Sequence, residues 1–485
     1  MNKEIFKLAP DRVWQHFYSI TQIPHPSKKE KALGDFILNF GKKLGLESVV
    51  DEVGNVIIRK PATPGMENCK GIILQGHFDM VPQKNSDVKH DFEKDPIEAY
   101  VDGEWVTANG TTLGADNGIG CAAAMAVLEA TDLVHGPIEA LFTIDEETGM
   151  TGAFGLKPGL LKGDILMNLD SETEGELYVG CAGGLDANIK FDIKKESVPA
   201  NTKAYRLAVT GLRGGHSGMD IVLGRANSIK LAFRFLYSAQ KMGIRIGQID
   251  GGSLRNAIPR EAFIEVIVPA DKAKELEAMA ANHEAIYKAE FSATEPTLRM
   301  ALESGAAPQF VMDERSQGNI IRAIFGCPNG VVRMSDSMPG LVETSTNLAV
   351  VRTEGDTVVA SCLLRSSVDS SKDALANKMA GIFELAGAQI TFKGGYPGWK
   401  PNMQSPILNT MIEVYERKYG KKPEIKAIHA GLECGLLGGV YPNLDMISFG
   451  PTICSPHSPD EKVNIKTVGK FWDFLVEVLK NTPQK

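Results

Sequence analysis

Three short apolar runs in the first 170 residues are each followed by side chains of the types that can bind metal ions. The runs span residues 71–74, 138–144 and 165–169, and the side chains that follow them are His77, Asp79, Glu146, Glu147 and Asp170. An Ala- and Gly-rich segment with helical spacing, 117–130, lies between the first two runs. Strands that alternate with helices form a largely parallel sheet. We therefore expect an α/β fold with a mostly parallel sheet flanked by helices.

The positions of these side chains predict a metal site. In open α/β sheets, ligands bind beyond the carboxyl ends of the strands, where all the candidates are expected. Asp116 precedes the helical segment, and His457 follows much later in the chain. Zinc takes imidazole nitrogen and carboxylate oxygen at about 2.0–2.2 Å, and two metals about 3.5–4 Å apart can activate water and polarise a carbonyl group. The pattern therefore indicates a hydrolase with two divalent metals.

The spacing within each cluster suggests separate roles. His77 and Asp79 lie on the same side of a strand end, so Asp79 is a candidate partner for the second ring nitrogen of His77. Adjacent glutamates point in different directions, so one of Glu146 and Glu147 can bind metal while the other faces a reacting water. An acidic surface loop is the alternative for this pair.

Asp116 has two interpretations. Its two carboxylate oxygens could bridge two cations, or it could serve as the N-cap of the helix that follows. The surrounding Gly-Ala-Asp-Asn-Gly-Ile-Gly segment has neither the Gly-Lys-Ser/Thr ending nor the GxGxxG spacing of nucleotide-binding loops. Nucleotide binding is therefore disfavoured.

Composition narrows the class of protein. The formal net charge is -8 and no basic stripe is present, which argues against nucleic-acid binding. No apolar stretch is long enough to span a membrane, and the N-terminus lacks the apolar core of a signal peptide. The seven cysteines form no CxxC pair, which fits reduced thiols. We expect a cytoplasmic protein that binds neither nucleic acid nor membranes.

Two domains are expected. From about residue 186 the pattern changes to strands and charged helices, and it includes the glycine-rich loop around His216. If His457 joins the earlier ligands, the intervening residues form an insertion. We predict a catalytic metal-binding domain at 1–186 and 398–485, and an inserted α+β lid domain at 187–397.

Local signals add two expectations in the first domain. Ser27-Lys28-Lys29-Glu30 has the form of a capping box, followed by apolar residues at helical spacing and a stop at Gly45. The runs 49–53 and 56–58 flank Gly54-Asn55 and predict a hairpin.

Taken together, the motifs resemble the co-catalytic zinc peptidase family that includes carboxypeptidase G, aminoacylase and carnosinase. The resemblance is strongest to its aminoacyl-histidine dipeptidase (cytosolic non-specific dipeptidase) branch. It covers essentially the whole chain in order, through the segments GHFDMVP, TLGADNGIG, FTIDEETGMTGA, NLDSE, GLRGGHSG, SLRNAIPR, HAGLECG and GPTICSPHSPDE.

The resemblance implies a role for each site residue. His77 and Asp170 would hold one zinc, Glu147 and His457 the other, and Asp116 would bridge them, with a cis peptide bond after Asp116. Glu146 would be the general base and Asp79 would orient His77. From the lid, His216 would stabilise the oxyanion, and the remaining substrate contacts would be Asn256, Arg365 and Gly431.

The implied function is a metallo-dipeptidase that hydrolyses Xaa-His and other dipeptides through a metal-bridged water. Two divalent metals per chain are expected, with zinc first and manganese or cobalt as alternatives. An N-acyl amino acid deacylase, a tripeptidase or an aminopeptidase of the same family is the alternative function. A catalytically inactive, metal-dependent peptide-binding protein is a third reading, although it would be free to lose Glu146. Both a monomer and a homodimer remain open, as does the state of the lid without ligand.

Overall fold

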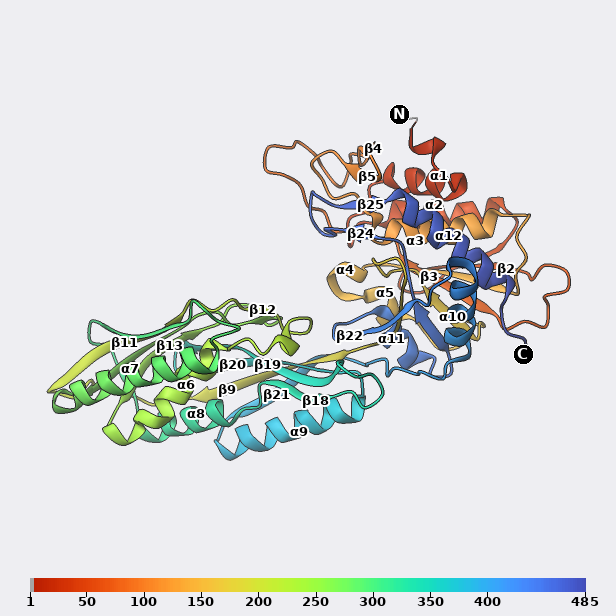
Figure 1. The fold of residues 1–485 in the computed structure, drawn as a ribbon. Helices are drawn as coiled ribbons and strands as arrows, with labels where there is room; N and C mark the ends of the chain where they lie inside the picture. Colours follow the sequence, from red (N-terminus) through yellow and green to blue (C-terminus); the bar gives the residue numbers. More distant parts are fainter. Residues whose placement is uncertain (1–3) are drawn as a thin grey trace. The chain divides into compact units, whose positions relative to one another are not determined.

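The computed structural model describes residues 4–485, which form two compact units (Figure 1). The first unit consists of the chain up to Gly180, Trp399–Ala427 and Leu432–Lys485. The second consists of Cys181–Gly398 and Ile428–Gly431, and it contains the whole of the predicted insertion, 187–397. No helix within residues 4–485 is long and apolar enough to cross a membrane.

The first unit is an α/β structure. Its elements are η1 (Ile5–Lys7), α1 (Asp11–Thr21), α2 (Lys31–Lys43), β1 (Glu47–Val50), β2 (Val56–Lys60), β3 (Ile72–His77), β4 (Ala99–Asp102), β5 (Trp105–Ala108), α3 (Ala115–Glu129), β6 (Ile138–Thr143), α4 (Glu146–Gly149), α5 (Thr151–Gly155), β7 (Ile165–Asn168), β8 (Glu176–Cys181), α10 (Pro406–Tyr419), β22 (Glu424–Ile428), α11 (Glu433–Val440), β23 (Asp445–Ser448), β24 (Ile453–Cys454), β25 (Lys462–Asn464) and α12 (Ile465–Lys480). Strands β8 and β22 each end one residue inside the second unit.

The main sheet of this unit has the order β1-β2-β6-β3-β7-β23-β8-β22. Strands β6, β3, β7 and β23 are parallel to one another, and the antiparallel pairs lie towards the edges. All residues of β3, β6 and β7 are buried, which explains why these strands appear in the sequence as continuous apolar runs. The predicted α/β class is confirmed.

Helix α3 shows why the sequence is rich in Ala and Gly at this point. The helix is buried along nearly its whole length and packs against α1 and β3. A β-carbon added at Gly118 would lie 3.1 Å from the Phe17 ring, and one at Gly120 would lie 2.5 Å from the carbonyl oxygen of Leu169. Only very small residues allow these close approaches, and the approaches fix the start of α3 against the sheet.

Of the two local expectations, the hairpin is confirmed and the capping box is wrong. Strands β1 and β2 pair antiparallel, with Val50 opposite Val56. Helix α2 begins only at Lys31, because Lys28 adopts a φ of 68°, which a helix cannot include. The hydroxyl group of Ser27 instead donates a hydrogen bond to Asp79 Oδ2 at 2.7 Å.

The second unit is an α+β structure. Its elements are β9 (Gly183–Asp192), β10 (Lys195–Glu196), β11 (Thr202–Thr210), β12 (Gly215–His216), η2 (Ile221–Leu223), α6 (Ser228–Ala239), η3 (Gln240–Met242), β13 (Arg245–Gly251), β14 (Ala257–Ile258), β15 (Ala262–Pro269), η4 (Ala270–Lys272), α7 (Ala273–Glu290), β16 (Arg299–Ser304), β17 (Val311–Met312), α8 (Glu314–Gly326), β18 (Gly330–Met334), β19 (Val342–Glu354), β20 (Thr357–Ser366), α9 (Asp369–Leu385) and β21 (Gln389–Tyr396).

A nine-stranded sheet forms the centre of this unit, with the order β16-β11-β15-β13-β19-β20-β9-β21 and β18 paired to β19. Helices α6, α7, α8 and α9 lie along one face of the sheet (Figure 1), and their apolar residues share one continuous core with it. Apart from this sheet, β12 and β14 form a short ribbon that places His216 opposite Ala257.

Candidate metal centre

The candidate metal ligands follow the parallel strands of the first unit. His77 is the last residue of β3, Glu146 and Glu147 lie three and four residues after the end of β6, and Asp170 lies two residues after the end of β7. Because β3 is parallel to β6 and β7, these side chains come to the same edge of the sheet. Asp116 is in the first turn of α3 and completes the group from a neighbouring element.

The first cluster is centred on the His77 ring. Its Nε2 atom lies 3.2 Å from Asp116 Oδ1 and 3.3 Å from Asp170 Oδ1. Ligand atoms of the three residues all lie within 4.8 Å of one another. Imidazole nitrogen with two carboxylate oxygens is a donor set that suits zinc.

The second cluster is centred on the His457 ring. Its Nε2 atom lies 3.1 Å from Asp116 Oδ2 and 2.9 Å from Glu147 Oε1. Asp116 therefore directs one oxygen towards His77 and the other towards His457. This is the arrangement that a carboxylate shared by two cations requires. The peptide bond between Asp116 and Asn117 is cis, as expected from the sequence resemblance.

Two buried oxygens in these clusters provide a test of whether cations fit. Asp170 Oδ1 and Glu147 Oε1 are each within 3.3 Å of an imidazole nitrogen, yet neither makes a hydrogen bond to any atom of residues 4–485. Buried polar atoms are normally satisfied. Oxygens that lie beside a nitrogen without pointing at it are expected where both atoms face a common cation, so the residues fit divalent metals.

The electrostatics of the cluster agree with this interpretation. Burial raises the pKa of Asp170 to about 6, and the carboxylates of Asp116 and Glu147 contribute to the rise, although His77 opposes it. The carboxylates of Asp116 and Glu147 beside its Nε2 atom raise the pKa of the His457 ring to about 11. Several carboxylates are thus crowded into a poorly solvated space, and a bound cation would offset their repulsion.

Asp79 connects His77 with the turn that follows β6. The Nδ1 atom of His77 lies 3.2 Å from the main-chain oxygen of Asp79 and 3.3 Å from its Oδ1. The same carboxylate accepts the main-chain N–H groups of Glu146, at 2.9 Å, and Glu147, at 3.3 Å, together with the Ser27 hydroxyl. Asp79 therefore holds both a candidate ligand and the two adjacent glutamates.

Glu146 belongs to a third group of ligand-type atoms within 4.8 Å, with His77 and Glu147. Burial raises its pKa well above the usual value, and the nearby carboxylates of Asp170 and Glu433 contribute to the rise. The main chain at this turn is held by Asp145, whose carboxylate accepts the hydroxyl groups of Thr148 and Thr151. A carboxyl group with such a pKa is suited to accept and return a proton.

A buried polar network lies directly behind the clusters, and the sequence did not point to it. Glu433 Oε2 accepts hydrogen bonds from Gln75 Nε2 at 2.6 Å and from the Thr143 hydroxyl at 2.8 Å. Gln75 Oε1 in turn accepts from Asn168 Nδ2 at 2.6 Å. Gln75 and Asn168 are each two residues before a candidate ligand. The only sequence signal for Glu433 was its place in the HAGLECG segment.

In the second unit, the His216 ring has a defined orientation. Its Nδ1 atom accepts main-chain N–H groups from Gly218, at 3.2 Å, and Met219, at 3.0 Å. The main-chain N–H group of His216 donates to Asp220 Oδ2 at 2.8 Å. Because Nδ1 accepts, the proton of the neutral ring is on Nε2. Burial and then the Arg365 charge lower the pKa of the ring, which favours this neutral form.

Arg365 lies beside the His216 loop. A β-carbon added at Gly218 would lie 3.2 Å from both Arg365 Nε and the His216 ring, and 2.1 Å from the main-chain oxygen of His429. Arg365 Nε is buried and has no hydrogen-bond partner in the described part of the chain. Its Nη1 group lies 3.4 Å from the Tyr396 hydroxyl. A buried guanidinium with a free donor is a candidate anion contact.

The other predicted substrate residues are near this arginine and histidine. A β-carbon at Gly431 would lie 3.1 Å from the Tyr396 hydroxyl, and the main-chain oxygen of Asn256 accepts the N–H group of Ser217 at 2.8 Å. His429 is also buried here, with its Nε2 2.7 Å from the Ser345 hydroxyl. Burial, followed by the Arg365 charge, lowers its pKa to about 3, so this ring is neutral.

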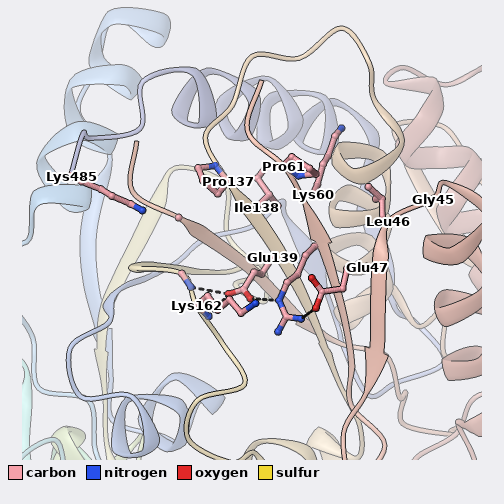
Figure 2. Close-up of a pocket in the computed structure, with 13 residues that line it drawn as sticks. Gly45, Leu46, Glu47, Lys60, Pro61, Pro137, Ile138, Glu139, Lys162 and Lys485 are labelled. Atoms are coloured by element: carbon pink, nitrogen blue, oxygen red, sulfur yellow. Dashed lines mark hydrogen bonds and ion pairs between the residues drawn. The ribbon is translucent and has the colours of Figure 1, made fainter. Parts of the chain in front are cut away.

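A separate pocket of about 440 Å³ is at the opposite edge of the main sheet (Figure 2). It is next to Gly71 and Ile138, where β3 and β6 begin, whereas the candidate ligands follow the ends of these strands. Arg59 donates to Glu139 at 2.8 Å and to Glu47 at 2.5 Å. These charges pair with one another, and none of the predicted site residues lines the pocket.

A family model, a curated relative and a solved structure all relate this chain to peptidases. Residues 73–481 match the model of peptidase family M20/M25/M40. The chain is 48% identical to the cytosol non-specific dipeptidase of Escherichia coli (strain K12) over 483 residues, which is 99% of this chain and 100% of that protein. The crystal structure of an aminoacylhistidine dipeptidase from Vibrio alginolyticus matches with a TM-score of 0.96 at 52% identity, covering 99% of both chains. Aminopeptidase PepT from Bacillus cereus ATCC 10987 shares the fold, with a TM-score of 0.58 at 17% identity over 98% of this chain and 99% of that chain.

Proposed function

The chain belongs to peptidase family M20/M25/M40, and we propose that it is a metal-dependent dipeptidase that uses two divalent cations. Membership of the family confirms the resemblance that the sequence motifs carried. The observation that most supports two cations is the position of Asp116, whose two oxygens face two different imidazole rings at 3.2 and 3.1 Å.

In this proposal His77 and Asp170 hold one cation, Glu147 and His457 hold the other, and Asp116 is shared. The donor set of nitrogen and carboxylate oxygen favours zinc, with manganese or cobalt as alternatives. Bound cations would supply Lewis-acid activation of water and of the peptide carbonyl group. Asp79 fixes the tautomer and orientation of His77 through the ring nitrogen that faces away from the cluster.

Glu146 acts as the general base. It accepts the proton of the attacking water at its carboxylate and returns that proton to the nitrogen of the leaving amine. Support comes from its place among the ligand-type atoms and from the fixed turn on which it lies. The presence of Glu146 also argues against a protein that binds peptides without cleaving them.

The second unit acts as the lid domain and supplies contacts to the substrate. His216 donates from Nε2–H to the oxygen that becomes negative during attack, since its Nδ1 is already occupied as an acceptor. Arg365 pairs with the terminal carboxylate of the dipeptide through its free Nε donor. Asn256 and Gly431 contribute further contacts beside these two residues.

The names of the two most similar relatives reported above support dipeptides as the substrates. The E. coli relative is a non-specific dipeptidase, and the V. alginolyticus structure is of an aminoacylhistidine dipeptidase. We therefore propose hydrolysis of Xaa-His and other dipeptides rather than deacylation of N-acyl amino acids or trimming of longer peptides. Because the E. coli relative is named a cytosol enzyme, we also propose a cytoplasmic location.

A hydrolysis panel tests this function. The metal-free chain is supplied with zinc, manganese or cobalt and offered dipeptides, β-alanyl-histidine, tripeptides and N-acetyl amino acids. Cleavage of dipeptides that exceeds cleavage of the other classes, and that is lost in Glu146→Gln, is expected. Preferential release of acetate from N-acetyl amino acids would replace the proposal with a deacylase.

A further inference from the structure

The carboxylate of Glu461 makes an unusual set of contacts with the chain that carries Asp116. Its Oε2 accepts the main-chain N–H groups of Leu113, at 2.7 Å, and Gly114, at 3.0 Å. Its Oε1 accepts those of Ala115, at 2.8 Å, and Asp116, at 3.3 Å. The side chain is buried, with 2% of its surface exposed. All four consecutive N–H groups leading to Asp116 are thus bound by one side chain.

The physical reason is the irregular chain that leads into helix α3. Leu113 and Gly114 precede the helix, and Asp116 and Asn117 have non-helical backbone angles. Because such buried N–H groups have no acceptor in a regular helix, they need one from elsewhere in the chain. Gly114, the N-cap residue, has no side chain that could accept these N–H groups. Glu461, more than 340 residues later in the chain, provides the negative charge that a local cap would otherwise provide.

Glu461 also belongs to the segment that contains His457. It follows His457 by four residues, and its main-chain N–H group donates to the Ser458 oxygen at 3.0 Å, which closes a tight turn between them. The main-chain oxygen of Glu461 accepts the Thr107 hydroxyl at 2.7 Å, so the turn is fixed to β5 as well. One side chain therefore connects the loop of the shared carboxylate with the loop of the second histidine.

We propose that Glu461 is a positioning residue for the metal centre. It sets the distance between Asp116 and His457, and through the Asp116 main chain it directs the two carboxylate oxygens towards the two cation positions. The inference rests on the proposed function, because it takes Asp116 and His457 as metal ligands. Its distinctive consequence is that loss of Glu461 weakens both cations together, whereas loss of a single histidine weakens mainly one.

The chain offers a matched control in Glu139. Its side chain is 6% exposed, and its Oε2 accepts two consecutive main-chain N–H groups, from Lys162 at 2.7 Å and Gly163 at 2.8 Å. It lies in the pocket of Figure 2, at the edge of the sheet away from the candidate ligands. Glu139→Gln and Glu461→Gln therefore make the same chemical change in a similar environment, but only one of them touches a ligand loop.

The test is a zinc titration of metal-free protein against a chromophoric chelator, with wild type, Glu461→Gln, Glu461→Asp and Glu139→Gln. An amide at position 461 places its NH₂ group against N–H donors, so we expect Glu461→Gln to bind both zinc ions about 10–100-fold more weakly, as for other residues that orient ligands. Glu461→Asp keeps the charge on a shorter side chain and should lose less affinity. Glu139→Gln should lower the thermal midpoint and leave both zinc affinities at the wild-type values.

If Glu461→Gln binds zinc as tightly as wild type, or loses no more zinc affinity than Glu139→Gln does, the positioning role is overturned. The proposed centre with two cations would still stand in that case. If Glu461→Gln does not fold, Glu461→Asp decides: weakened binding of both zinc ions supports the role, and unchanged binding overturns it. A wild-type chain that binds fewer than two zinc ions would instead overturn the proposed dimetal centre, and the role of Glu461 with it.

Discussion

Replacement of Asp79 by Asn should impair the position of Glu146 more than the binding of metal. The carboxylate of Asp79 accepts three hydrogen bonds, from the Ser27 hydroxyl and from the main-chain N–H groups of Glu146 and Glu147. An Asn at this position has one acceptor oxygen, so its NH₂ group must replace either Oδ1, to which Glu146 donates, or Oδ2, to which Ser27 and Glu147 donate. The least costly orientation keeps the 2.9 Å bond from Glu146, reverses the bond to Ser27 and loses the 3.3 Å bond from Glu147.

The free-energy cost of Asp79→Asn, and the fall in kcat that results, can be worked out from these three hydrogen bonds. Hydrogen bonds to charged groups contribute about 1.5–3 kcal/mol and neutral ones about 1 kcal/mol. Each of the two weakened bonds therefore loses at least about 0.5 kcal/mol and the lost bond at least about 1.5 kcal/mol, which amounts to at least about 2.5 kcal/mol. If this loss falls on the arrangement of the glutamates in the transition state, kcat should fall by at least about 70-fold, because each 1.36 kcal/mol is a factor of ten. The His77 ring keeps its contact with the main-chain oxygen of Asp79, so both cations should be retained.

Steady-state kinetics measures the fall in kcat, and elemental analysis of the same sample measures how many cations are retained. Ser27→Ala is the control, because it removes only one of the three bonds and should cost at least about 1.5 kcal/mol, or roughly 13-fold in kcat. A kcat in Asp79→Asn equal to that of wild type would refute the argument that the carboxylate positions Glu146. Loss of a cation in the same variant would mean that its main contribution is to hold His77.

Three further predictions concern the reaction. Glu146→Gln should keep the fold and both cations but lose about 10²–10⁴-fold in kcat, and near-normal turnover would move the general base elsewhere. His216→Ala should lower kcat with unchanged metal content, since the Nε2–H bond forms mainly in the transition state, and an unaltered kcat would remove this role. C-terminal amidation of a dipeptide should raise KM for wild type far more than for Arg365→Ala, and equal effects in the two proteins would show that Arg365 does not bind the carboxylate.

The sequence was most informative where apolar strands end. His77, Glu147 and Asp170 could be placed at one edge of a parallel sheet because buried parallel strands are continuous apolar runs, and the residue after such a run is at the edge by geometry. The α/β class followed from the same pattern. Asp116 was harder to place from the residues alone, since an Asp before a helix serves equally well as an N-cap.

Contacts between distant segments could not be predicted. Glu461 binds residues 113–116 and Glu433 binds Gln75, across separations of more than 340 residues, and no local pattern distinguishes such carboxylates from surface ones. The Ser27 error has the same origin. A local capping box was expected, but the hydroxyl group forms a tertiary hydrogen bond to Asp79, and a left-handed Lys28 delays the helix.

The central claim is that one carboxylate, Asp116, is shared by two cations, and metal stoichiometry tests it most directly. Elemental analysis of protein purified without chelator and dialysed against zinc should give two ions per chain in wild type. His77→Ala and His457→Ala should each retain about one ion, and Asp116→Ala should lose affinity for both. A wild-type value that stays at zero or one ion per chain after dialysis would contradict the account.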